Sequence, residues 1–105
     1  MYPMVYTFRY MEIQTTEYFD QWFDSLIDRT TRVRVVFAIE KVKLGNFGNT
    51  KILRAGLYEI KIDFGPGYRI YYCRQGEAII ILLSGGNKSS QRNDIDKALK
   101  LKERI

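Results

Sequence analysis

Residues 57–72 read LYEIKIDFGPGYRIYY, and this stretch predicts two β-strands joined by a tight turn. Apolar and polar side chains alternate over residues 57–64, which is the two-residue period of a strand with one buried face. Gly65-Pro66-Gly67 predicts the turn, because proline fixes φ and the second glycine tolerates a positive φ. Residues 68–74 are expected to form the returning strand. The stretch therefore predicts an antiparallel β-hairpin at the centre of the fold.

On the C-terminal side of the hairpin, the sequence predicts one more strand and a helix. Gln75-Gly76 predicts a turn, and the unbroken apolar run at residues 78–83 is typical of a central strand covered on both faces. We expect Ser84-Gly85-Gly86-Asn87 to end this strand. A last helix is expected from about Ser90, and it carries apolar residues on one face: Ile95, Ala98 and Leu99.

On the N-terminal side, the pattern predicts a strand, two helices and a short strand. Residues 5–15 are rich in β-branched and aromatic residues, which predicts the first strand. Thr16 is expected to cap a helix with an apolar stripe of Phe19, Trp22, Phe23 and Leu26. A second, basic helix runs from Asp28 or Thr30 to about Leu44, where Gly45 ends it. Residues 51–55 predict a short strand after a turn-rich loop.

The predicted order is β-α-α-β-β-β-β-α, which indicates a single α+β domain spanning residues 1–105. The last four strands form an antiparallel meander, and we expect the helices to pack on one face of the sheet. Residues 1–10 are either an extension of the first strand or a start-site artefact, since Met11 is an alternative start. No run approaches the roughly 20 apolar residues of a membrane span, and no signal peptide is apparent.

Composition narrows the possible chemistry. There are 17 Lys and Arg against 12 Asp and Glu, a net charge of +5, which favours nucleic acid, an acidic protein or an anionic surface as partner. The lone cysteine, Cys73, excludes a disulfide framework and fits a reducing, cytoplasmic compartment. The absence of histidine excludes histidine acid–base catalysis, and we expect neither a metal nor another cofactor.

The polar face of the hairpin is the candidate functional surface. Hairpin pairing places Glu59, Lys61, Arg69 and Tyr71 on one face, which we expect to be open to solvent. Asn87, Lys88 and Gln91 follow the central strand and are expected at its rim. Cations bind phosphates and aromatic rings stack on bases, so this pattern favours RNA. The alternative is an ordinary solvated face with a Glu59–Lys61 surface pair.

RNA cleavage without histidine requires an unusual set of groups. In one scheme the 2′-hydroxyl attacks the adjacent phosphate, and Arg69 stabilises the pentavalent transition state. Lys61 or Glu59 would accept the proton, and Tyr71 or Lys88 would assist the leaving 5′-oxygen. The glycine pair at residues 85–86 either ends a strand or lets the backbone approach RNA.

Four blocks of the chain resemble one known family. GNFG (45–48), GPGYRIYY (65–72), GGNKSSQ (85–91) and DIDKA (94–98) resemble the phage-derived addiction-module killer proteins, in the HigB/RelE branch of the RelE/ParE toxin superfamily. The resemblance covers roughly residues 11–102. It implies that the protein is a type II toxin with a compact α+β fold. It also implies that this toxin cuts mRNA on the ribosome without a metal ion. It also implies a helix-turn-helix antitoxin as cognate partner, through which alone the toxin reaches operator DNA.

The resemblance carries over to individual residues in part. Arg69 matches the family's "YR" arginine, whereas Lys61 stands where the family usually has arginine. Lys88 and Gln91 match the block after the central strand. The catalytic set is thus Lys61, Arg69, Tyr71 and Lys88, and the RNA-binding set is Glu59, Asn87, Gln91 and Arg54.

The resemblance also implies a catalytic Tyr or His near the C-terminus, as relatives in the wider superfamily often have; none follows Tyr72 here, which makes Tyr71 a substitute for that group. Two other functions stay open. One is a ParE-like inhibitor of DNA gyrase without catalysis, and the other is a degenerate toxin that binds only its antitoxin.

Overall fold

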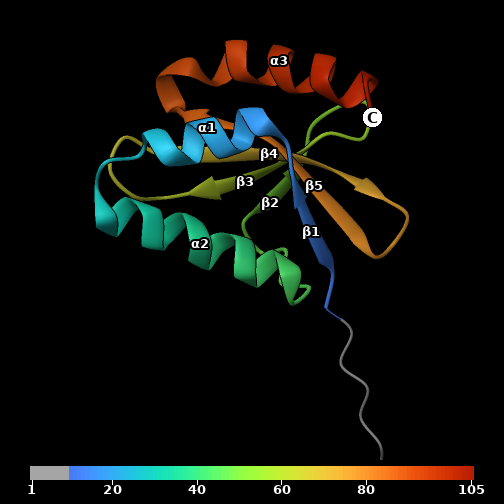
Figure 1. Ribbon diagram of the computed structural model, residues 1–105, viewed down its shortest axis with the longest axis horizontal. Helices are drawn as coiled ribbons and strands as arrows, with labels where there is room; N and C mark the ends of the chain where they lie inside the picture. The colour runs from blue at the N-terminus through green and yellow to red at the C-terminus, as the bar shows by residue number, and fades with distance from the viewer. Residues whose placement is uncertain (1–9) are drawn as a thin grey trace, which may run out of the picture.

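The computed structural model describes residues 10–105 (Figure 1). Its first strand, β1, spans Glu12–Thr15, so the predicted strand over residues 5–15 is too long within the described part. Tyr10 and Met11 precede the strand, and the rest of that prediction lies outside the described residues. No helix within residues 10–105 is long and apolar enough to cross a membrane.

Five strands form one sheet in the order β1-β5-β4-β3-β2. The last four form the predicted antiparallel meander: β2 (Thr50–Ile52), β3 (Tyr58–Ile62), β4 (Tyr68–Gln75) and β5 (Ile79–Asn87). The short strand expected at residues 51–55 is thus confirmed with shifted bounds. β1 joins the sheet at its edge and pairs with β5 in parallel. Gly67 has a φ of +81°, as expected for the turn between β3 and β4.

β5 continues through Ser84-Gly85-Gly86-Asn87, so the prediction that these residues end the strand is wrong. The two glycines make room for side chains instead. A Cβ on Gly85 would overlap the ring of Trp22, and a Cβ on Gly86 would overlap the carboxylate of Asp94. The glycines are therefore packing positions inside a strand, where a missing Cβ permits close approach.

Three α-helices follow the predicted order: α1 (Glu17–Ser25), α2 (Arg29–Lys43) and α3 (Gln91–Glu103). Thr16 caps α1 by accepting a hydrogen bond from the Phe19 N–H, and Asp28 caps α2 through the Thr31 N–H. A 3₁₀ turn at Lys88–Ser90 precedes α3, so the last helix starts one residue later than predicted.

The helices cover both faces of the sheet, and the expectation of a single covered face is wrong. Phe19 of α1 and Val35 of α2 pack with Ile70 and other residues on one face. Ala98 and Leu101 of α3 pack on the other face, against a cluster that includes Leu83. Figure 1 shows α3 on the opposite side of the sheet from α2. The apolar run of β5 explains this, because its side chains project alternately to both faces and both need cover.

Candidate nucleic-acid interface

The hairpin brings the predicted site residues onto one face. Lys61 lies opposite Arg69, and Glu59 lies opposite Tyr71. The expectation that this face is open is nevertheless wrong for three of them, since Arg69 is 8% exposed, Glu59 4% and Tyr71 0%. The face also carries apolar Leu57 and Cys73, which pack with α3. Burial of this apolar surface by α3 encloses the polar side chains beside it.

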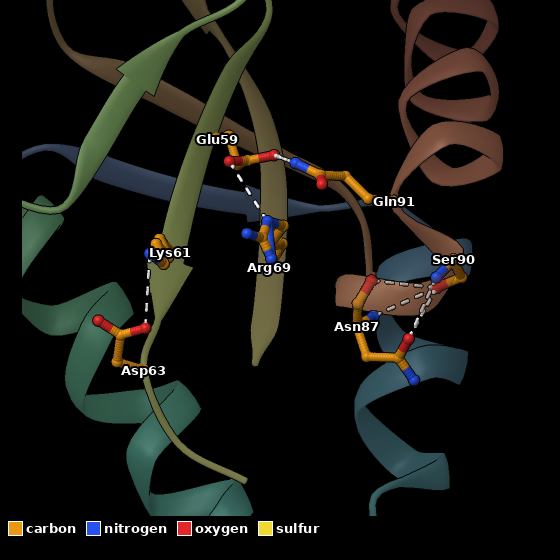
Figure 2. A network of polar contacts seen from close by, with 7 residues as sticks. All are labelled: Glu59, Lys61, Asp63, Arg69, Asn87, Ser90 and Gln91. Atoms are coloured by element: carbon orange, nitrogen blue, oxygen red, sulfur yellow. Dashed lines mark hydrogen bonds and ion pairs between the residues drawn. The ribbon is translucent and has the colours of Figure 1, made fainter. Parts of the chain in front are cut away.

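Glu59, Arg69, Tyr71 and Gln91 form a polar cluster, which we call the Arg69 cluster. Glu59 lies at its centre and links β4 to α3 (Figure 2). Its Oε1 lies 3.5 Å from Arg69 Nε, and its Oε2 accepts a 2.8 Å hydrogen bond from Gln91 Nε2. Gln91 is the first residue of α3. The carboxylate therefore pairs with the buried arginine and also fixes the start of the covering helix.

Several buried polar atoms near this ion pair have no hydrogen-bond partner within residues 10–105: Arg69 Nε, Arg69 Nη1, Tyr71 Oη and Ser84 Oγ. The Arg69–Glu59 contact is an ion pair that lacks hydrogen-bond geometry. Buried donors are normally paired, and an unpaired one is costly. An anion that reached Arg69 would supply acceptors to these donors.

Tyr71 is held in its protonated form. Burial raises the pKa of its hydroxyl above the ordinary value, the carboxylates of Glu59 and Asp94 raise it further, and Arg69 opposes the shift. A phenol that keeps its proton can donate a hydrogen bond but cannot act as a base. Its complete burial keeps the ring from stacking on a base in this conformation.

Lys88 and Arg69 both lie next to the turn between β3 and β4. A Cβ placed on Gly67 would lie 3.7 Å from Lys88 Cβ and 4.0 Å from Arg69 Nη1. Lys88 is exposed, so it forms the solvent side of the cluster. Its neighbour Asn87 caps the 3₁₀ turn, because the side-chain oxygen accepts from the N–H groups of Ser89 and Ser90.

Two predicted cations lie at the border of the cluster or outside it. Lys61 is half-exposed and its Nζ lies 3.6 Å from Asp63 Oδ1 (Figure 2). Arg54 is exposed and pairs with Asp96 of α3 at 3.4 Å. None of the polar contacts of residues 10–105 joins Arg54 to Arg69, Glu59 or Gln91.

Residues 21–103 match a family model, described as phage derived protein Gp49-like. The chain belongs to this family. An uncharacterized protein from Haemophilus influenzae is 37% identical over 95 residues, which is 90% of this chain and 96% of that protein.

Two solved structures share the fold of this Gp49-like chain. A conserved hypothetical protein from Helicobacter pylori has a TM-score of 0.55 at 20% identity, over 75% of this chain and 96% of that one. A chain of the toxin–antitoxin complex RelBE2 from Mycobacterium tuberculosis has a TM-score of 0.51 at 16% identity, over 79% of this chain and 97% of that one.

Sequence reasoning missed Ser84 and Asp94 in the Gp49-like site. Ser84 lies opposite Tyr71, and Asp94 accepts a hydrogen bond from the Ser90 hydroxyl beside Gly86. A register shift between Tyr71 and Tyr72 changes which β5 side chains face α3, and nothing in the sequence marks it. Residues 10–105 hold no group of three or more His, Cys, Asp or Glu side chains placed to bind a metal ion.

Proposed function

We propose that this Gp49-like protein is the toxin of a type II toxin–antitoxin pair and a HigB-like, metal-independent endoribonuclease that cuts mRNA on the ribosome in the cytoplasm. The observation that carries the proposal is the buried guanidinium of Arg69, whose Nη1 has no hydrogen-bond partner within residues 10–105 and lies close to the same turn as the exposed Lys88. A phosphate accepts in-plane hydrogen bonds from arginine, so an RNA phosphate at this position would supply an acceptor for Nη1, while Nε keeps its ion pair with Glu59. The fold shared with a chain of RelBE2 supports the proposal.

The reaction proceeds by attack of the RNA's own 2′-hydroxyl. The 2′-oxygen forms a bond to phosphorus while the bond to the 5′-oxygen breaks, which yields a cyclic phosphate and a 5′-hydroxyl end. Arg69 stabilises the charge on the pentavalent phosphorus. Lys61, which is half-exposed on the strand beside Arg69, is a better candidate than the buried Glu59 to accept the 2′-hydroxyl proton, and Lys88 donates one to the leaving oxygen.

The remaining predicted residues support this site from within. Because Tyr71 is fully buried, we assign it to positioning Arg69 and Glu59 and not to contact with RNA. Gln91 holds Glu59 from the start of α3, and Asn87 at the end of β5 caps the 3₁₀ turn that carries Lys88. Arg54 is exposed and pairs with Asp96, and we assign it a peripheral contact with the RNA backbone outside the Arg69 cluster.

The partner in this proposal is a helix-turn-helix antitoxin encoded beside the toxin. The antitoxin would neutralise the toxin and would alone bring it to operator DNA. The net charge of +5 favours an acidic or amphipathic antitoxin segment.

Induction of the protein in growing cells, with mapping of mRNA 5′ ends, tests the proposed cleavage. Arg69→Lys keeps the charge beside Glu59 but loses the planar fork, so we expect about a hundredfold fewer cleaved ends with a thermal midpoint close to wild type. Arg104→Lys is the matched control, because Arg104 is exposed near the C-terminus. Growth arrest with DNA breaks and no new 5′ ends would indicate gyrase inhibition. No arrest at all would indicate a degenerate toxin.

A further inference from the structure

Helix α2 exposes a cluster of apolar side chains. Val33 is 55% exposed, Val36 46% and Phe37 63%, while Val35 on the same helix is fully buried. The three exposed residues follow the i, i+3, i+4 spacing of one helix face, which we call the α2 docking face. A contiguous exposed apolar cluster of this kind marks an interaction surface.

A hollow lies on each side of the α2 docking face. One has a volume of about 660 Å³ and lies between α2 and β3, where Val33 and Phe37 face Ile62 and Phe64. The other has a volume of about 400 Å³, and Phe23 of α1 joins all three residues of the docking face in lining it. Val33 and Phe37 line both hollows and so form the ridge between them. A ridge with a hollow on each side suits the interdigitating side chains of a second helix.

The rim of this surface is strongly basic. Five basic residues of α2 stand against the single acid Glu40: Arg29, Arg32, Arg34, Lys41 and Lys43. Arg29 and Arg32 line one hollow, and Arg34 and Lys41 line the other. Arg32 and Arg34 stack on the rings of Phe23 and Phe64. No ion pair joins these cations to a carboxylate of the part of the chain that the structure describes.

We propose that the α2 docking face binds an acidic amphipathic helix of a protein partner, with its apolar residues in the two hollows and its carboxylates against the basic rim. The proposal deepens the partner half of the proposed function and does not depend on RNA cleavage. α2 packs on the face of the sheet opposite α3, whereas Arg69 lies on the α3 side. The docking face itself is therefore separate from Arg69, and the hollow between α2 and β3 also reaches Lys61, a candidate base of the proposed reaction.

The same features disfavour other occupants. A second copy of this chain would bring an identical basic rim against the first, which is repulsive. A flat bilayer would leave the two hollows unfilled. RNA offers no apolar side chains to cover Val33 and Phe37, although it would match the charge.

Binding of defined peptides to the purified full chain tests the proposal. The probe is a labelled helical peptide of about 18 residues, roughly five turns, with leucine at the i, i+3, i+4, i+7 spacing and glutamate elsewhere. A matched peptide has lysine in place of glutamate. Fluorescence anisotropy gives each Kd, and vesicles of anionic phosphatidylglycerol replace the peptide in a parallel assay. We expect the glutamate peptide to bind about tenfold or more tightly than the lysine peptide.

Variants locate the contact. Phe37→Glu is expected to raise the Kd of the glutamate peptide about tenfold or more. Ile105→Glu, at an exposed apolar residue of the C-terminus, is expected to leave this Kd unchanged. The double change Arg29→Glu and Lys41→Glu leaves α2 with three basic and three acidic residues and is expected to abolish the preference for the glutamate peptide. Thermal unfolding checks that each variant is folded, and Val36→Glu replaces Phe37→Glu if the latter is not.

Three results would overturn the proposal: equal binding of the two peptides, wild-type binding by Phe37→Glu, or Phe37-dependent capture by vesicles without peptide binding. The assay involves no RNA cleavage, so a failed peptide test and a failed induction test are distinguishable. Phe37→Glu should still produce mRNA cleavage in the induction assay, because Phe37 lies outside the Arg69 cluster.

Discussion

Tyr71 combines complete burial with a hydroxyl that lacks a hydrogen-bond partner within residues 10–105. The alternation of residues in the hairpin predicted its face correctly, together with Glu59, Lys61 and Arg69. The sequence did not predict its burial, because the covering residues belong to α3 and Gln91 lies 32 positions after Glu59. Local periodicity indicates which side chains share a face but not which distant element covers them.

The Tyr71→Phe variant tests whether the buried Tyr71 hydroxyl stays protonated and lacks a hydrogen-bond partner in the folded protein. We expect its stability at neutral pH to lie within about 1 kcal/mol of wild type, since the hydroxyl is not in hydrogen-bond geometry with any group of residues 10–105 and only its weaker interaction with Glu59 is lost. The folded-state pKa of Tyr71 is raised above its ordinary value of 10.0, so the unfolded chain loses this proton first as pH rises. The stability due to neutral Tyr71 is therefore complete below about pH 10 and falls by about 1.4 kcal/mol per pH unit above it.

Urea unfolding at pH values on both sides of 10 measures this difference. Wild type should lose stability more steeply than Tyr71→Phe in the alkaline range. A smaller decline remains in the variant, because burial also raises the pKa of Tyr72. Identical slopes for the two proteins would contradict the assignment of a raised pKa to Tyr71.

At the scale of elements, the junction of β5 with α3 depends on Gly86. Its missing Cβ leaves space for the Asp94 carboxylate and the Ser90 hydroxyl. Gly86→Ala would force α3 to shift, and we expect a loss of about 1–3 kcal/mol of unfolding free energy. Gly48→Ala is the control, since its nearest neighbour is the flexible side-chain oxygen of Asn46. Equal thermal midpoints for the two variants would contradict the tight packing at Gly86.

The helix caps show where local sequence signals are sufficient to predict the structure, and the glycines of β5 show where they are not. The sequence predicts Thr16 as a helix cap and leaves Asp28 or Thr30 as the start of the second helix. Thr16 and Asp28 cap their helices, because capping depends only on residues within one turn. The glycines of β5 predict the end of a strand, because Gly usually breaks one, and this prediction is wrong. Trp22, 63 residues before Gly85, fills the space beside that glycine, and no local pattern specifies such a contact.

At the scale of the whole molecule, the net charge of +5 predicts salt-dependent association with ribosomes. Lys88 is the exposed cation of the Arg69 cluster, so Lys88→Ala should lower the slope of log Kd against log salt by about 1. Lys100→Ala, an exposed lysine of α3 with no assigned contact, is the control. Titration of purified ribosomes at several salt concentrations gives the slopes. An unchanged slope for Lys88→Ala would show that Lys88 contacts no phosphate.

The parallel pairing of β1 with β5 also determines when the molecule can be completed during its own synthesis. The Thr16 hydroxyl donates to the Leu83 carbonyl, 67 residues further along the chain. The first strand must therefore wait for nearly the whole polypeptide to emerge before it can dock, and such long-range closure slows folding. Lys88 and α3 emerge later still. β1 can therefore dock only after β5 has been synthesised, so the sheet is completed late in the synthesis of the residues that form it.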